Sequence, residues 1–255
     1  MPDNPYEAND SSPNSISKSS VFTWVFRIGI TLVIGIVLLG LFLPAVRRAQ
    51  PAAHRMSCSS NLRQLGIALS EYELAYHELP PAYTVDESGK PLHSWRTLIL
   101  PYLEQQDLYS KIDLTKSWDD PANDAARQTN VRCFRCPAAK MPQGMTTYQA
   151  VIAPSSCLQP GKGRLLEEIS DGLANTLLLV ESDVSDAVHW MSPLDLTLGK
   201  LLSSSAKSNT AHLGGRNVCF GDSSLKFFVH EVSIEMIRAM VTIDGGEDLN
   251  SMLND

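Results

Sequence analysis

The sequence is poor in the signatures of known chemistry. It has no Gly-x-Ser-x-Gly nucleophile turn, no His-Glu-x-x-His zinc helix and no glycine-rich phosphate loop. It also lacks a clustered Lys/Arg face, and its net charge is -7, which argues against a nucleic-acid partner. We therefore predict a protein that is not an enzyme, uses no cofactor and binds no nucleic acid.

Charge is also absent from one long apolar run, Ile28–Val46. About 20 helical residues, each rising 1.5 Å, span the roughly 30 Å hydrocarbon core of a bilayer. Trp24 and Arg27 precede the run and two arginines follow it, as suits a membrane interface. We predict a transmembrane helix over residues 21–48, with the lipid bilayer as a partner. A cleaved signal peptide and a buried soluble helix are the alternatives.

The segments on either side of this run differ in composition. Residues 1–20 are rich in Ser, Asn, Asp and Pro, which predicts a disordered polar tail. Residues 49–255 have the composition of one globular domain, long enough to bury a core without disulfides. The 5 cysteines are compatible with two bridges and one free thiol, or with five reduced thiols.

A helical period continues after the apolar run. Leu62, Leu65 and Leu69 recur at three- and four-residue steps and form one apolar stripe. Pro44 and Pro51 are expected to kink or briefly interrupt the helix, because each removes a backbone donor. The pattern predicts one long helix whose first half lies in lipid and whose second half is the spine of the soluble domain.

The sequence of the rest of the chain predicts short helices followed by short strands. Ser94 is a suitable N-cap for a helix over 95–109, and Pro121 suits the first position of a helix over 121–129. The remaining predicted elements are strands at 131–136, 146–153 and 175–182, a hairpin of 217–220 with 225–229 closed by Gly221–Ser224, and a helix over 233–241. This order favours an α+β fold with a mainly antiparallel sheet.

Several segments together carry a family resemblance. They are LPAVRRAQ, CSSNLRQLGIALSEYELAYHELPP, WRTLILPYLEQQDLY, ISDGLANTLLLVES, VHWMSPLDL and HLGGRNVCFGDSSLKFF, with a Cys136-Pro137 step between the third and fourth. The chain resembles a large planctomycete family of pilin-like proteins that carry a domain of unknown function. Members of that family have a prepilin-type N-terminus and end in a His-x9-Asp-Gly motif. The resemblance extends in order from Leu43 to Glu247.

The resemblance implies a pilin- or pseudopilin-like anatomy, in which the long N-terminal helix packs on a mainly antiparallel sheet outside the cytoplasm. The implied function is that of a membrane-anchored, non-catalytic structural or interaction protein of the cell envelope. Other pilin-like subunits or envelope proteins are its implied partners. An anchored extracytoplasmic module that binds a small molecule or a polysaccharide is the alternative. The excess of arginine after the apolar run favours the opposite, cytoplasmic orientation.

The chain departs from the family pattern at its N-terminus. With Pro44 taken as the pilin proline, Phe22 stands where the cleavage-site glycine belongs and Arg27 stands where the glutamate belongs. A prepilin peptidase needs a small residue at the scissile bond. We therefore expect an unprocessed, single-pass anchored relative rather than a polymerised pilin.

The family-motif residues lie in two turns. They are Asp171, Gly172, Asn175 and Thr176 before one strand, and His212, Gly214, Gly215 and Asp222 around the hairpin. Asp and Asn suit tight turns because they bond nearby backbone groups, and a calcium site at Asp171 and Asn175 is the alternative. Ser223 replaces the glycine of the motif, which a turn tolerates at modest cost.

The remaining candidates for chemistry are cysteine and histidine. Cys133-x-x-Cys136 has the spacing of half a zinc site or of a redox pair, and a disulfide is the third possibility. The family resemblance implies that Cys58 pairs with Cys136 in a structural bridge. A metal cluster or hydrolytic triad is conceivable for the set Glu181, Asp183, His189 and His212. We expect His212 to order a turn instead.

Overall fold

The computed structural model describes residues 18–205, 210–212, 214–229 and 232–247. The chain divides into two compact units, Met1–Gln50 and Pro51–Asp255, and each is described by itself. Of the predicted polar tail over 1–20, residues 1–17 lie outside the described residues. Lys18 to Ser20 already belong to the first helix.

The predicted long helix is present as α1, Lys18–Tyr76. It is assigned as one continuous helix, so the brief interruption that we expected at Pro44 or Pro51 does not occur. Within the first unit, the segment Phe22–Leu41 is 20 residues long, has a mean hydropathy of 2.3 and has no buried residue. By length and composition, this segment is able to cross a bilayer.

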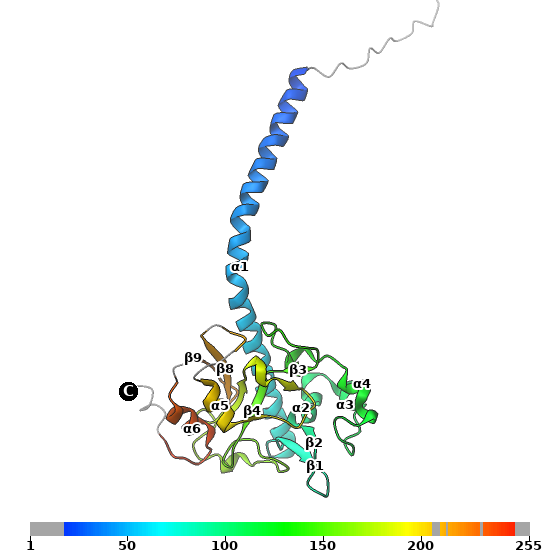
Figure 1. The fold of residues 1–255 in the computed structure, drawn as a ribbon, viewed down its shortest axis with the longest axis vertical. Helices are drawn as coiled ribbons and strands as arrows, with labels where there is room; N and C mark the ends of the chain where they lie inside the picture. Colours follow the sequence, from blue (N-terminus) through cyan, green and yellow to red (C-terminus); the bar gives the residue numbers. More distant parts are fainter. Residues whose placement is uncertain (1–17, 206–209, 213, 230–231, 248–255) are drawn as a thin grey trace, which may run out of the picture. The chain divides into compact units, whose positions relative to one another are not determined.

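The second unit contains a five-stranded sheet, shown with its surrounding elements in Figure 1. Its strand order is β7-β4-β5-β8-β9, and every pairing is antiparallel except that of β4 with β7. The strands are β4 Tyr148–Ile152, β5 Leu177–Glu181, β7 Leu196–Thr197, β8 Gly215–Phe220 and β9 Leu225–Val229. The predicted α+β fold with a long helix on a mainly antiparallel sheet is confirmed.

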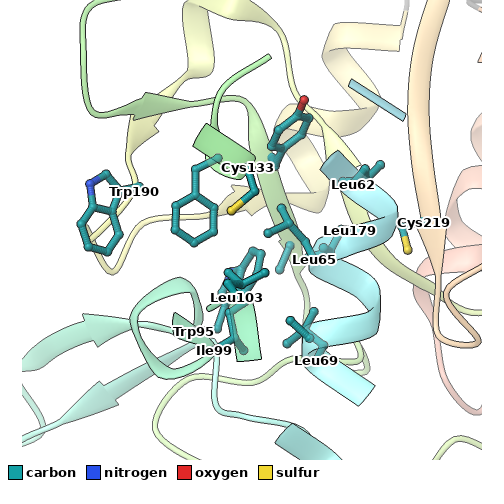
Figure 2. Close-up of a cluster of buried hydrophobic side chains, with 14 of the residues drawn as sticks. Leu62, Leu65, Leu69, Trp95, Ile99, Leu103, Cys133, Leu179, Trp190 and Cys219 are labelled. Atoms are coloured by element: carbon teal, nitrogen blue, oxygen red, sulfur yellow. The ribbon is translucent and has the colours of Figure 1, made fainter. Parts of the chain in front are cut away.

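Both faces of this sheet are covered. The second half of α1 packs on one face, where Leu62, Leu65 and Leu69 are fully buried among side chains from several other elements (Figure 2). Helices α5, Leu198–Ser205, and α6, Ile234–Val241, contribute to a second cluster with the other side chains of the sheet. A strand buried on both faces reads as a continuous apolar run, which explains the sequence LLLV in β5.

Two smaller antiparallel pairs flank this arrangement: β1 Tyr83–Val85 with β2 Pro91–Ser94, and β3 Met145–Thr146 with β6 Val188–His189. The predicted β8–β9 hairpin is confirmed, as is the terminal helix α6, which Ser233 caps by accepting from the Met236 N–H. Ser223 adopts a positive φ of 63° in the hairpin turn. The Asp222 carboxylate accepts from the Ser224 N–H at 2.9 Å.

The prediction of one continuous helix over 95–109 is wrong. Ser94 caps the first piece as expected, but the segment consists of α2 Trp95–Leu98, the 3-10 helix η1 Leu100–Leu103 and α3 Gln106–Tyr109. Pro101 has no N–H for an α-helical bond, and Glu104 has a left-handed φ of 57°. These two residues divide the segment.

The predicted strand over 131–136 is also wrong. Residues Arg132–Phe134 form the 3-10 helix η3, in which the Phe134 N–H donates to the Val131 carbonyl at 3.2 Å. Cys133 and Phe134 are both buried in this turn of helix. The predicted helix over 121–129 is shorter than expected. It consists of the 3-10 helix η2, Pro121–Asn123, and of α4, Asp124–Arg127. The remaining short helices are η4 Leu166–Glu168 and η5 Val184–Asp186.

Candidate functional site

Four buried polar and sulfur-bearing side chains converge where α1 meets the sheet of the second unit. Cys58 comes from α1, Cys136 follows η3, Glu181 ends β5 and His212 precedes β8. One donor atom of each lies within 4.8 Å of the donor atoms of the others. We call these four residues the Cys-His-Glu cluster.

Cys58 and Cys136 form a disulfide, with their Cα atoms 5.1 Å apart and 78 residues apart in sequence. This is the pair that the family resemblance implied. Closing a loop of this length stabilises a fold by about 4.5 kcal/mol in the chain-entropy model. The bridge ties the second half of α1 to the segment that follows η3.

Glu181 and His212 face each other beside this bridge. The His212 Nε2 atom lies 3.3 Å from Glu181 Oε1 and 3.7 Å from Cys136 Sγ. The other carboxylate oxygen, Oε2, accepts from Asn217 Nδ2 at 2.9 Å, whereas Oε1 has no hydrogen bond. A fully buried carboxylate with one oxygen left without a hydrogen bond is costly, because burial removes the water that would otherwise bond it.

The other members of the conceivable metal cluster or triad lie elsewhere. Asp183 pairs with Arg216, whose Nη2 is 3.1 Å away, and the same nitrogen donates to Ser204 Oγ. Burial lowers the pKa of Arg216, and Asp183 opposes that shift. The His189 ring packs against Trp118 in a tilted arrangement, with ring centroids 5.2 Å apart. The structure therefore brings together only Glu181 and His212 of the four.

The Cys133-x-x-Cys136 spacing does not make a redox pair in this structure, because Cys136 bonds to Cys58 and Cys133 is a free thiol. Burial raises the pKa of Cys133 to about 11. The other two free thiols, Cys157 and Cys219, are also buried, and burial raises the pKa of each to about 12. A thiol that stays protonated is a poor nucleophile and a poor redox group.

The first family motif forms a turn before β5. Gly172 has a positive φ of 86°, Asn175 Nδ2 donates to the Asp171 carbonyl, and Thr176 Oγ1 donates to the Gly172 carbonyl. The Asp171 carboxylate accepts from the N–H groups of Gly245 and Gly246 at 2.8 and 2.9 Å. These bonds use Asp171 to hold the segment after α6, in keeping with a turn.

The glycines of the second motif place β8 beside β9. Gly214 has a positive φ of 84°, and His212 makes an isolated β-bridge with Gly215. A Cβ atom on Gly215 would lie 2.0 Å from the Phe228 carbonyl oxygen. Because Gly215 has no side chain, β8 can pair with β9. This pairing fixes the position of β8 and therefore the position of His212, which precedes it.

Sequence reasoning missed a buried ion pair. Arg96 Nη2 lies 2.5 Å from Asp195 Oδ1, and that oxygen also accepts from the Ala150 N–H and from Trp95 Nε1. Burial raises the pKa of Asp195, and the Arg96 charge opposes the shift. The sequence offered two signals: an arginine directly after Trp95 in HSWRTLIL, and the position of Arg96 and Asp195 in two of the segments that carry the family resemblance.

A solvent-accessible cleft of about 560 Å³ lies away from the Cys-His-Glu cluster. The residues that line it are Trp118, Arg127, Gln128, Gln143, Gly144 and His189. An aromatic face with amide and guanidinium donors around it is suited to a polar ligand that has an apolar face.

The comparisons with known proteins identify one family. Residues 47–164 match the model of a family described as protein of unknown function (DUF1559). This region is less than half of the chain, and it contains Cys58 and Cys136 but neither Glu181 nor His212. The chain is thus similar to that family over the second half of α1 and the segments up to Arg164. No curated protein and no solved structure matches the chain.

Proposed function

We propose that the protein is a membrane-anchored, non-catalytic, pseudopilin-like structural or interaction protein of the cell envelope. The observation that carries this proposal is the segment Phe22–Leu41, whose apolar side chains have no partner among the described residues. Soluble monomers rarely expose so large a contiguous apolar surface. A lipid bilayer covers such a surface fully.

The one threonine in the middle of this segment supports the same proposal. Thr31 Oγ1 donates to the carbonyls of Arg27 and Ile28, at 3.1 and 2.9 Å. A hydroxyl group that is satisfied by its own helix enters lipid without an unpaired donor. Aromatic Trp24, 67% exposed, stands near the start of the segment, where the membrane interface is expected.

The use of polar groups in the second unit supports a non-catalytic role. The buried carboxylates of Asp183 and Asp195 each pair with an arginine, and the free thiols are buried with raised pKa values. These groups stabilise the fold rather than face a cleft. The family that matches residues 47–164 is described as one of unknown function, so this match does not suggest a reaction.

Topology and processing are tested together in intact cells. We propose that the second unit is extracytoplasmic and that the N-terminus is not cleaved. External protease should therefore degrade the second unit once the outer layer is opened, and sequencing of the membrane-bound protein should give a start upstream of Phe22. A start at Thr23 would contradict the absence of prepilin processing, and protection in spheroplasts would place the domain in the cytoplasm.

Association with other subunits is tested by crosslinking in membranes. Single cysteines introduced along Phe22–Leu41 should crosslink to neighbouring helices with a period near 3.6 residues if the segment is a packing element. The five native cysteines are buried or bridged among the described residues, so the introduced thiols report alone. Uniform absence of crosslinks would favour an isolated anchor.

The cleft lined by Trp118 favours a second candidate function, an anchored module that binds a polysaccharide. Tryptophan faces and amide side chains are the groups that pack on and bond to sugar rings. A glycan array probed with the full chain in detergent should then give binding that Trp118→Ala abolishes. Tyr76→Ala, which removes a 58% exposed aromatic on α1, is the control and should leave binding unchanged.

A further inference from the structure

We infer that the Cys-His-Glu cluster is a zinc site when its disulfide is reduced, and that the Cys58–Cys136 bridge is the oxidised, metal-free state of the same four residues. This inference goes beyond the proposed function and does not depend on it. It rests on the identity of the four donors, their burial, two donor-to-donor distances and a buried oxygen that has no hydrogen bond.

The donor set suits zinc. Two thiolates, an imidazole and a carboxylate are all ordinary zinc ligands, and four protein donors close a tetrahedral structural site. The exposed fractions are 0% for Cys58, Cys136 and Glu181 and 6% for His212. The site has no room for exchange with bulk water, which is typical of structural rather than catalytic zinc.

The distances already match two edges of a zinc tetrahedron. Usual zinc–ligand bond lengths place a nitrogen and an oxygen donor about 3.4 Å apart, and a nitrogen and a sulfur donor about 3.6 Å apart. The corresponding separations are 3.3 Å from His212 Nε2 to Glu181 Oε1 and 3.7 Å from the same nitrogen to Cys136 Sγ. Thus His212 Nε2 is separated from Glu181 Oε1 and from Cys136 Sγ as one zinc ligand is separated from another.

The Glu181 carboxylate is also oriented by a neighbouring side chain, as metal ligands usually are. Asn217 Nδ2 donates to Glu181 Oε2 at 2.9 Å, which fixes the orientation of the carboxylate. Glu181 Oε1, the oxygen that faces His212 and the sulfurs, has no hydrogen bond. A partner that orients the ligand through its other atom is typical of metal sites. A zinc ion would give Oε1 a bonded partner, where it now has no hydrogen bond and only the 3.3 Å contact with His212 Nε2.

The chemical change between the two states takes place at the sulfur atoms. A dithiol reductant passes two electrons and two protons to the Cys58–Cys136 bond, which gives two thiols while the reductant becomes its own disulfide. Zinc then displaces the two thiol protons and binds two thiolates. The sulfurs separate to about 3.8 Å, the edge length of the tetrahedron. Either state ties α1 to the segment after η3.

The test uses the full chain in detergent under anaerobic conditions. The protein is reduced, freed of reductant and titrated with Co²⁺, which reports on a zinc site through its colour. We expect one equivalent of Co²⁺ to bind with tetrahedral visible bands and a thiolate-to-cobalt band in the near ultraviolet, and Zn²⁺ to displace it. The oxidised protein should bind no Co²⁺, and a circular dichroism spectrum before reduction confirms that each variant is folded.

Variants separate a four-ligand site from binding by sulfur alone. Glu181→Gln and His212→Ala should each weaken binding by at least about tenfold and alter the visible bands. Cys133→Ser, which changes a buried free thiol near Cys136 in sequence but outside the cluster, should leave the spectrum unchanged. The inference is overturned if the reduced protein binds no Co²⁺, if the bands are octahedral, or if the Glu181 and His212 variants bind as the unchanged chain does.

Discussion

The two halves of α1 contain similar residues but bury them differently. Leu32 in the first half is 60% exposed, whereas Leu62 in the second half is fully buried. Apolar side chains surround the helix in the first half, but in the second half they recur on one face while Arg63 and Gln64 remain exposed. A helix needs apolar residues on every side to lie in lipid, but only one stripe to pack on a sheet.

The largest loss of stability is expected at the buried ion pair of the second unit. The described residues of the first half of α1 include no buried charge. Asp195→Ala leaves the Arg96 guanidinium buried without its counter-charge, and should lower the free energy of unfolding by about 3–5 kcal/mol. Asp186→Ala is the control. It breaks an ion pair with Lys200, whose side chain is 61% exposed, and should cost about 0–1 kcal/mol. Equal losses in chemical denaturation would show that the Arg96 pair is not buried in solution.

Matched leucine truncations test the comparison directly. Leu62→Ala removes a fully buried side chain and should lower the free energy of unfolding by about 2–5 kcal/mol. Leu38→Ala removes a 47% exposed side chain in the first half of α1 and should change it by less than about 0.5 kcal/mol. Unfolding of the full chain in detergent, followed by tryptophan fluorescence, to which the buried Trp95 and Trp190 contribute, gives both values. A large loss for Leu38→Ala would mean that the first half packs on protein.

The free thiols give a pH dependence to the second unit. Burial raises the pKa of Cys133 to about 11 and of Cys157 and Cys219 to about 12, whereas an unfolded thiol ionises near about 8.5. Above about pH 8.5 the unfolded chain therefore releases protons that the folded chain keeps, so stability should fall as the pH rises toward 11–12. Below about pH 8.5 the thiols are protonated in both the folded and the unfolded chain, so they should add no pH dependence.

Alkylation measures the same property. Iodoacetamide at pH 8 should leave the native chain unmodified and should modify all three free thiols in denaturant. Rapid labelling of any of them in the native chain would contradict their burial.

The smallest effect is expected in the hairpin turn. Ser223 has a positive φ of 63°, so Ser223→Gly should relieve backbone strain and raise the free energy of unfolding by up to about 1 kcal/mol. The gain is reduced by the loss of the contact between Ser223 Oγ and Ser70 Oγ, at 3.3 Å. Ser224→Gly, at a position without positive φ, is the control and should destabilise slightly. The thermal midpoint of each variant distinguishes the two signs.

Elements with strong local patterns were predictable, and those decided by distant contacts were not. The β8–β9 hairpin follows from alternating apolar residues around a Gly-Asp turn, and α1 follows from its apolar period. In contrast, residues 131–136 have the composition of a strand, but Arg132–Phe134 form the 3-10 helix η3, because tertiary contacts there override local propensity.

The candidate site was predictable only in part. Glu181 and His212 were recognised as candidates, but their proximity depends on the pairing of β5 with β8, which no local pattern fixes. The pairing of Cys58 with Cys136 came from resemblance alone, since spacing left other pairings open. Arg96 and Asp195 could not be paired from the sequence, because they lie in two segments that are far apart in the chain and no spacing rule links those segments.

The central claim, that the first half of α1 lies in lipid while the second half belongs to the folded domain, is tested most directly by alkaline extraction of membranes that contain the full chain. The unchanged chain should stay in the membrane pellet, Leu32→Arg should shift a large part of it to the supernatant, and Leu74→Arg, at a 73% exposed leucine of the second half, should behave as the unchanged chain does. Complete extraction of the unchanged chain, or equal behaviour of the two arginine variants, would contradict the account.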